Sequence, residues 1–74
     1  MPKLPVVSGE QCRKALEHWG YIKDHQTGSH MIMVKEGCVP ITVPRHDELD
    51  RGLLRGIIRS TGLRVEQFIW LLKQ

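Results

Sequence analysis

The spacing of the apolar residues changes twice along this chain, and that change restricts the folds it can adopt. In the first part the apolar residues recur at the helical period of about 3.6 residues, at Cys12, Ala15, Leu16 and Trp19. From residue 21 to residue 43 the apolar residues alternate with a period of two, and beyond residue 50 the spacing is helical again. One helix, then strands, then helices predict an α+β domain.

The first helix is marked at both ends. Ser8 is a candidate N-cap, and Gln11 three residues later completes a capping box. Gly20 follows the apolar stripe and can adopt the left-handed conformation that ends a helix. We therefore expect a helix between Ser8 and Gly20 that packs its stripe against the rest of the domain.

Three short strands follow. We expect them at Tyr21 to His25, His30 to Lys35, and Cys38 to Val43. Gly28-Ser29 and Glu36-Gly37 form the two tight turns, which predicts an antiparallel meander. Pro40 lacks an amide donor, so the third strand is expected at a sheet edge, or at least with this backbone position pointing away from its neighbour.

Two helices close the chain. The first starts at about Asp50 and carries Leu53, Leu54, Ile57 and Ile58, and the second carries Val65, Phe68, Ile69 and Leu72. Thr61-Gly62 separates them. The predicted order is α-β-β-β-α-α, in a single domain over residues 1–74. It has a three-stranded antiparallel sheet with helices on one face, and this arrangement resembles a double-stranded-RNA-binding domain.

Composition narrows the class of protein. Eleven Lys and Arg against eight Asp and Glu give a net charge of +3, which permits a polyanionic partner. No apolar run approaches the roughly 20 residues of a membrane span, and the first residues lack the apolar stretch of a signal peptide. Cys12 and Cys38 form no CxxC pair, so we expect free thiols in a cytoplasmic protein. No His or Cys pair has the close spacing of a zinc site, and we expect neither a metal nor another cofactor.

Three motifs resemble the HicA (YcfA-like) family of mRNA interferase toxins. They are Gly28-Ser29-His30, the run Ile41-Thr42-Val43-Pro44-Arg45-His46, and the segment from Glu48 to Leu63, which is similar to the family signature E-L-x-x-G-x-L-R-x-I-L-R-x-x-G-L. The resemblance extends from Ser8 to Leu72. It implies the toxin of a type II toxin–antitoxin system, an endoribonuclease that cleaves mRNA and is held inactive by a HicB-like antitoxin. In that family the His of the Gly-Ser-His step is catalytic, which corresponds to His30 here.

RNA cleavage requires little of the protein, because the RNA supplies its own nucleophile, the 2′-OH. One group takes the proton of this hydroxyl, another protonates the 5′ leaving oxygen, and positive charge offsets the phosphate. Imidazole titrates at about pH 6.5 and suits either proton transfer without a metal, which is the role expected of His30. Gly28 lets the backbone approach a phosphate, and amides around Ser29 are candidate donors. The alternative is that His30 only starts a strand, in phase with Ile32 and Val34 on the core face.

Further candidate contacts for RNA follow the third strand. They are Arg45, His46 and the row Arg51, Arg55 and Arg59, which recur at i, i+4 and i+8 on a helix. The row has an alternative interpretation as a solvated helix face, and His46 has one as a helix cap. His25 is a candidate for the second proton-transfer group, with an exposed strand-end histidine as the alternative.

Met31 and Met33 alternate with Ile32 and Val34. If the helices cover the Ile32 side, the two methionines are exposed and suit a protein partner, with plain surface packing as the alternative. Two other functions stay open: a non-catalytic RNA-binding module of the same fold, and a protein-interaction module. Cleavage distinguishes the enzyme from both, and salt-sensitive RNA binding distinguishes the two modules.

Overall fold

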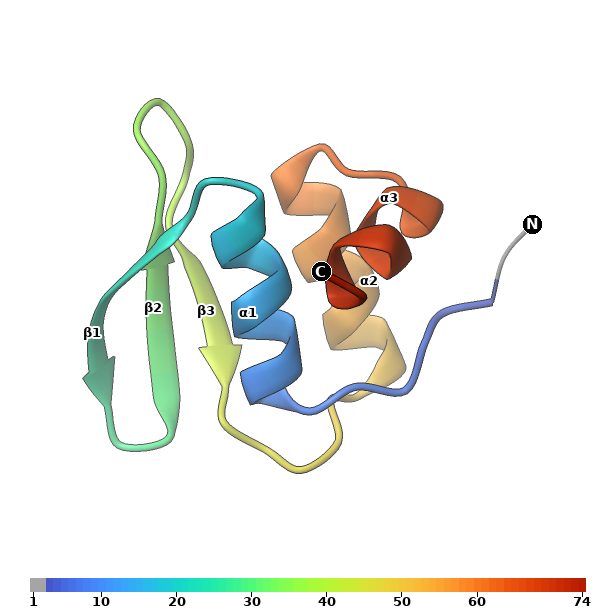
Figure 1. Cartoon of the computed structure of the whole chain (residues 1–74). Coiled ribbons are helices and arrows are strands. Elements are labelled where there is room, and N and C mark those ends of the chain that lie inside the picture. Colours follow the sequence, from blue (N-terminus) through green and yellow to red (C-terminus); the bar gives the residue numbers. More distant parts are fainter. Residues whose placement is uncertain (1–2) are drawn as a thin grey trace.

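The computed structural model describes residues 3–74, whose elements follow the predicted order (Figure 1). The helices and strands are α1 (Gly9–His18), β1 (Ile22–Thr27), β2 (His30–Val34), β3 (Ile41–Pro44), α2 (Arg51–Thr61) and α3 (Val65–Leu72). The strands form one antiparallel sheet in the order β1-β2-β3. The helices lie together on one side of this sheet (Figure 1). The predicted α+β architecture is confirmed.

The start of α1 is fixed by hydrogen bonds and by a close approach to β3. The amide of Gln11 donates to Ser8 Oγ at 3.1 Å, and the amide of Ser8 donates to Gln11 Oε1 at 2.8 Å, which forms the expected capping box. A Cβ on Gly9 would lie 2.0 Å from the carbonyl oxygen of Pro44. Only glycine therefore lets the first turn of α1 rest against the end of β3.

The core lies between the sheet and the helices. Its largest fully buried side chains are Tyr21, Phe68, Leu16, Met31, Met33, Leu54, Val43 and Cys12. Cys12 and the exposed Cys38 are both free thiols, as predicted. Within residues 3–74 no helix is long and apolar enough to span a membrane.

The predicted exposure of Met31 and Met33 is wrong, because both are 0% exposed in the core. The reason is the register of β2 and β3. A two-residue turn at Glu36-Gly37 would pair Ile32 with Ile41, whereas Met33 pairs with Ile41 in the structure. A shift of one residue exchanges the two faces of a strand. Burial of the two methionines removes the reason for assigning them to a partner surface.

The shift follows from a longer connection between the two strands. Residues 35–40 lie outside any strand, and β3 starts at Ile41 rather than Cys38. Val39, which was expected in β3, is 78% exposed in this connection. The longer loop delays pairing until Met33 and Ile41 face each other, so the core of the sheet is built on methionine.

The other face of the sheet is open to solvent. His30, Ile32 and Val34 alternate with the buried methionines and therefore lie on this open face. Ile22 of β1 pairs with Val34 and is 64% exposed. The open face thus carries a small apolar surface next to His30, on the side of the sheet away from the helices.

Candidate active site

His30 is the first residue of β2 and follows the Gly28-Ser29 turn directly. All three residues are exposed. Gly28 has a φ of 58°, a conformation that favours glycine, and no atom lies within 4 Å of the position of its absent Cβ. The turn is therefore open to a ligand, which can approach the backbone and the His30 imidazole together.

Arg45 lies beside this turn because of the backbone pairing at the end of the sheet. Pro44 pairs with His30, and the amide of Arg45 donates to the carbonyl of Ser29 at 2.6 Å. The Arg45 side chain is exposed. The structure thus brings the backbones of four predicted site residues, Gly28, Ser29, His30 and Arg45, together at one corner of the sheet.

His46 follows Arg45 at the same corner. Its carbonyl accepts a 2.8 Å hydrogen bond from the amide of Gly9, which ties the loop after β3 to the start of α1. It does not cap the next helix, because Asp50 has that role: Asp50 Oδ2 accepts from the amides of Gly52 and Leu53 at 3.1 and 3.3 Å. The His46 side chain is exposed and does not cap α2.

A carboxylate reaches into this corner from α1. Glu10 Oε1 lies 3.6 Å from Arg45 Nε, while Glu10 Oε2 accepts a 2.8 Å hydrogen bond from Arg13 Nη2. The hydrogen bond from Arg13 lowers the pKa of Glu10, and the charges of Arg13, Arg45 and Lys23 act in the same direction. An ionised Glu10 therefore offsets part of the positive charge of Arg45 at this corner.

The predicted arginine row lies on the exposed surface of α2, where it extends away from His30. The start of α2 lies at the same end of the molecule as the β1–β2 turn (Figure 1). Arg51 is the first residue of the helix, and Arg59 lies about 12 Å further along its axis at 1.5 Å per residue. Among residues 3–74, Arg51, Arg55 and Arg59 form no ion pair. Arg51 therefore starts at the end of the molecule that holds the β1–β2 turn, and Arg59 lies furthest from that end.

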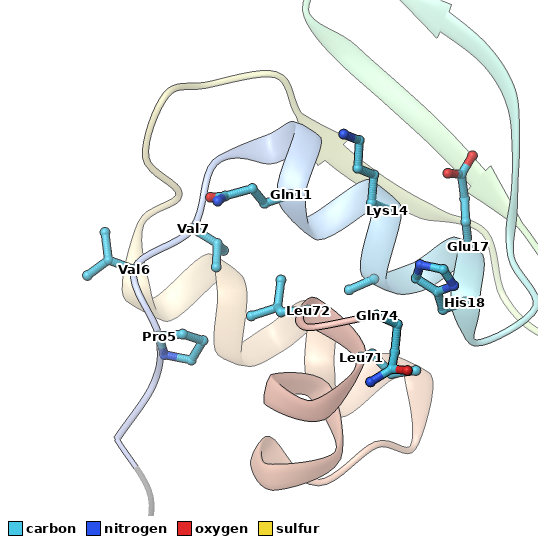
Figure 2. Close-up of a pocket in the computed structure, with 11 residues that line it drawn as sticks. Pro5, Val6, Val7, Gln11, Lys14, Glu17, His18, Leu71, Leu72 and Gln74 are labelled. Carbon is cyan, nitrogen blue, oxygen red and sulfur yellow. The ribbon is translucent and has the colours of Figure 1, made fainter.

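The candidate site is an exposed corner, and several cavities lie elsewhere. One, of about 300 Å³, lies between the N-terminal segment, α1 and the C-terminal end of the chain (Figure 2). Another, of about 440 Å³, is a groove lined by Arg55, Ile58, Arg59, Leu63, Arg64, Val65 and Glu66. Neither includes His30. Within residues 3–74 no group of three His, Cys, Asp or Glu side chains is arranged to hold a metal ion.

Comparisons with known proteins match most of the chain. The family model described as "HicA toxin of bacterial toxin-antitoxin" matches residues 9–63. A chain from a solved structure described as a toxin–antitoxin complex from Streptococcus pneumoniae is 38% identical, with a TM-score of 0.70. The match covers 77% of this chain and 98% of that one. A comparison with curated proteins gives no match.

Proposed function

The chain belongs to the HicA toxin family of bacterial toxin–antitoxin systems, and on that premise we propose that it is a metal-independent endoribonuclease that cleaves mRNA. His30 is the proposed catalytic residue, acting as general base or general acid. The observation that carries the proposal is an exposed histidine directly after an open Gly-Ser turn, with Arg45 hydrogen-bonded to that turn. An exposed corner of this kind accepts a polymer, whereas a closed pocket would not.

The proposed reaction uses the hydroxyl of the RNA itself. His30 removes the proton of the 2′-OH, the 2′ oxygen bonds to phosphorus, the bond from phosphorus to the 5′ oxygen breaks, and a second acid protonates that oxygen. The products are a 2′,3′-cyclic phosphate and a 5′-OH end. Amides of the Gly28-Ser29 turn and the Arg45 guanidinium are the proposed partners of the reacting phosphate.

The remaining predicted contacts are proposed to hold the rest of the strand. His46 follows Arg45 directly and Arg51 begins α2 at the same end of the molecule, and both would bind the adjoining phosphate. Arg55 and Arg59 continue along α2 and would bind only a longer RNA. We expect the protein to act in the cytoplasm, where translated RNA is found.

Replacement of His30 by alanine tests the proposal. The variant His30→Ala is expected to cleave a defined RNA at least about 100-fold more slowly than the parent chain, because general acid–base catalysis contributes roughly 10²- to 10⁴-fold. His18→Ala is the matched control, an exposed histidine on α1 that should leave the rate unchanged. Melting curves establish that both variants fold, and cleavage by the parent should persist in EDTA.

Two outcomes would overturn the enzyme proposal. If His30→Ala folds and cleaves at the parent rate, His30 is a structural strand-end residue. If the parent chain binds RNA in a salt-sensitive way and leaves it intact, the chain is an RNA-binding module. End-group analysis completes the test, because a cyclic phosphate identifies attack by the 2′-OH.

The partner of the chain is proposed to be a HicB-like antitoxin that covers the open sheet face. Ile22, Ile32 and Val34 offer apolar area there, and a protein bound over them would block access to His30. Ile22→Glu should weaken binding of an antitoxin that inhibits the parent, with cleavage retained. Val6→Glu, at a position that is 76% exposed outside the sheet, is the control and should bind normally. Equal binding by both variants would exclude this face.

A further inference from the structure

We infer that His25, oriented by Asp24, is the second proton-transfer residue of the RNA cleavage reaction. This inference rests on the proposed function and adds the group that protonates the leaving oxygen. It is carried by an irregularity in β1 that brings Asp24 and His25 together on the sheet face of His30.

The irregularity is a β-bulge. Lys23 pairs with Met33 and His25 pairs with Ile32, so Asp24 is an extra residue in β1 that has no partner in β2. In a regular strand, the side chains of Asp24 and His25 would point to opposite faces of the sheet. Bulges change the direction of side chains and occur frequently next to active sites. Here the bulge lets two consecutive side chains meet.

The contact between these side chains is short. Asp24 Oδ2 lies 2.6 Å from His25 Nδ1, at the short limit of a charge-assisted hydrogen bond. An ionised carboxylate can only accept a hydrogen bond, so beside an ionised Asp24 the Nδ1–H of His25 donates the hydrogen bond to Oδ2. This arrangement holds the ring in one orientation and leaves Nε2 free to exchange a proton with a ligand.

The register sets the distance between the two histidines. Thr27 pairs with His30, and His25 pairs with Ile32, the next residue of β2 on the open face. His25 and His30 are therefore diagonal neighbours on one face, and residues in that relationship lie about 7–8 Å apart. Two imidazoles at that separation can reach the two sides of one phosphodiester. Both residues are exposed, so the space between them is open to RNA.

The other histidines fit this role less well. His18 lies on α1, on the helical side of the sheet. His46 is near the corner, but within residues 3–74 no carboxylate is paired with its ring. Only His25 combines an orienting carboxylate with a position on the face of His30.

The proton balance of the reaction is complete with these two groups. His30 takes the proton from the 2′-OH as the 2′ oxygen bonds to phosphorus. As the bond to the 5′ oxygen breaks, protonated His25 donates the proton on Nε2 to that oxygen and yields the 5′-OH. His30 then returns its proton to water and His25 takes one up, which restores the starting state.

The test compares two substrates that differ in their need for an acid. A defined RNA oligonucleotide releases an alkoxide that must be protonated, whereas the four nucleoside 3′-(4-nitrophenyl phosphates) release a stable nitrophenolate. His25→Ala should cleave RNA at least about 100-fold more slowly than the parent, and should cleave the nitrophenyl substrates at nearly the parent rate. His30→Ala should lose activity on both. His18→Ala should keep the parent activity on both substrates.

Asp24 is a positioning residue, and its test needs a separate readout. Asp24→Asn should lower the rate on RNA while sparing the nitrophenyl substrates. In ¹⁵N NMR spectra, the His25 ring of this variant should lose its preference for the proton on Nδ1. An unchanged tautomer in Asp24→Asn would contradict the orienting role.

The inference and the proposed function fail in different ways. Two results would show that His25 is not the acid while leaving the role of His30 unchanged. In the first, the parent and the folded His25→Ala variant cleave RNA equally fast. In the second, His25→Ala loses activity on RNA and on the nitrophenyl substrates to the same extent. If the parent cleaves neither substrate, the proposed function fails and the inference fails with it.

Discussion

The amide of Arg45 donates a 2.6 Å hydrogen bond to the carbonyl of Ser29, which joins the residue after β3 to the turn before β2. Pro44 has no amide hydrogen, so Arg45 supplies the first backbone donor beyond β3. The bond fixes the backbone of Arg45 next to the turn that precedes His30. The guanidinium of Arg45 is held less firmly, because its side chain is exposed and shares its charge with Glu10.

Removing the charge of Glu10 should strengthen RNA binding. Glu10→Gln leaves Arg45 without its carboxylate partner, and an exposed ion pair of this kind is worth about 0.2–1 kcal/mol, which allows up to about a fivefold gain in affinity. Glu17→Gln is the matched control. It makes the same change in net charge, but Glu17 pairs with Arg13 and not with Arg45. The measurement is RNA affinity at low salt with both changes made in the His30→Ala chain. Equal gains in the two variants would mean that net charge, not Arg45, sets the affinity.

Two glycines in helices should respond to alanine with opposite signs. Gly9→Ala places a Cβ 2.0 Å from the Pro44 carbonyl oxygen, so α1 must move away from β3. Overpacking of this kind typically costs about 1–3 kcal/mol in the free energy of unfolding. Gly56→Ala meets nothing within 4 Å and should add about 1 kcal/mol, because alanine favours a helix interior. Urea denaturation measures both, and a stable Gly9→Ala variant would show that α1 is not pressed against β3.

Charged substitutions distinguish the two faces of the sheet. Met33→Glu introduces a carboxylate into the core without a partner and should lower the free energy of unfolding by more than about 4 kcal/mol, which unfolds a domain of this size. Ile22→Glu lies on the open face and should stay within about 0.5 kcal/mol of the parent. Met33→Leu, which preserves volume, should cost less than about 1.5 kcal/mol. Circular dichroism and urea titration report the three effects, and a folded Met33→Glu chain would mean that this face is not the core.

The thiol of Cys12 should make the fold sensitive to alkaline pH. Burial raises the pKa of Cys12 from its ordinary value of 9.0 to about 12. Above pH 9 the unfolded chain loses a proton that the folded chain keeps, so stability is fully present below pH 9 and falls between about pH 9 and pH 12. The slope is about 1.4 kcal/mol per pH unit for one group.

Cys12→Ala isolates this effect. The variant loses some stability at every pH from the smaller side chain, and its free energy of unfolding should fall less steeply than that of the parent between pH 9 and pH 10.5. Burial also raises the pKa of Tyr21, which contributes in the same direction in both chains and cancels in the comparison. Parallel curves for the two chains would show that the Cys12 thiol ionises normally in the fold.

The helices and their order were predictable from the sequence because their signals are local. Ser8 and Gln11 form the capping box that their spacing predicts, and Gly62 ends α2 with a φ of 78°. The core face of β2 was not predictable in the same way, since both of its faces are apolar. The choice between the two faces depends on the length of the connection between β2 and β3. The Glu36-Gly37 pair predicts a two-residue turn, whereas the connection covers residues 35–40.

The residues of the candidate site also differ in how far the sequence alone indicates them. The Gly28-Ser29 turn and His30 are contiguous, so the sequence alone indicates them. Arg45 joins them through a hydrogen bond between distant segments, which only the sheet register reveals. The sequence alone does not indicate that Asp24 contacts His25, because neighbouring residues in a strand are expected to point apart, and the bulge that reverses this leaves no clear mark in the sequence.

The bulge at Asp24 also bears on the tendency of the sheet to aggregate. β1 is an edge strand, and its unpaired backbone groups are a template on which a strand from another molecule can add. The extra residue interrupts the regular spacing of these backbone donors and acceptors, so an added strand could pair with only a short stretch of β1. Deletion of Asp24 would straighten this edge and open it to intermolecular association. The same deletion would remove the carboxylate that contacts the ring of His25. Asp24 would therefore limit strand addition at this edge and also orient the proposed acid.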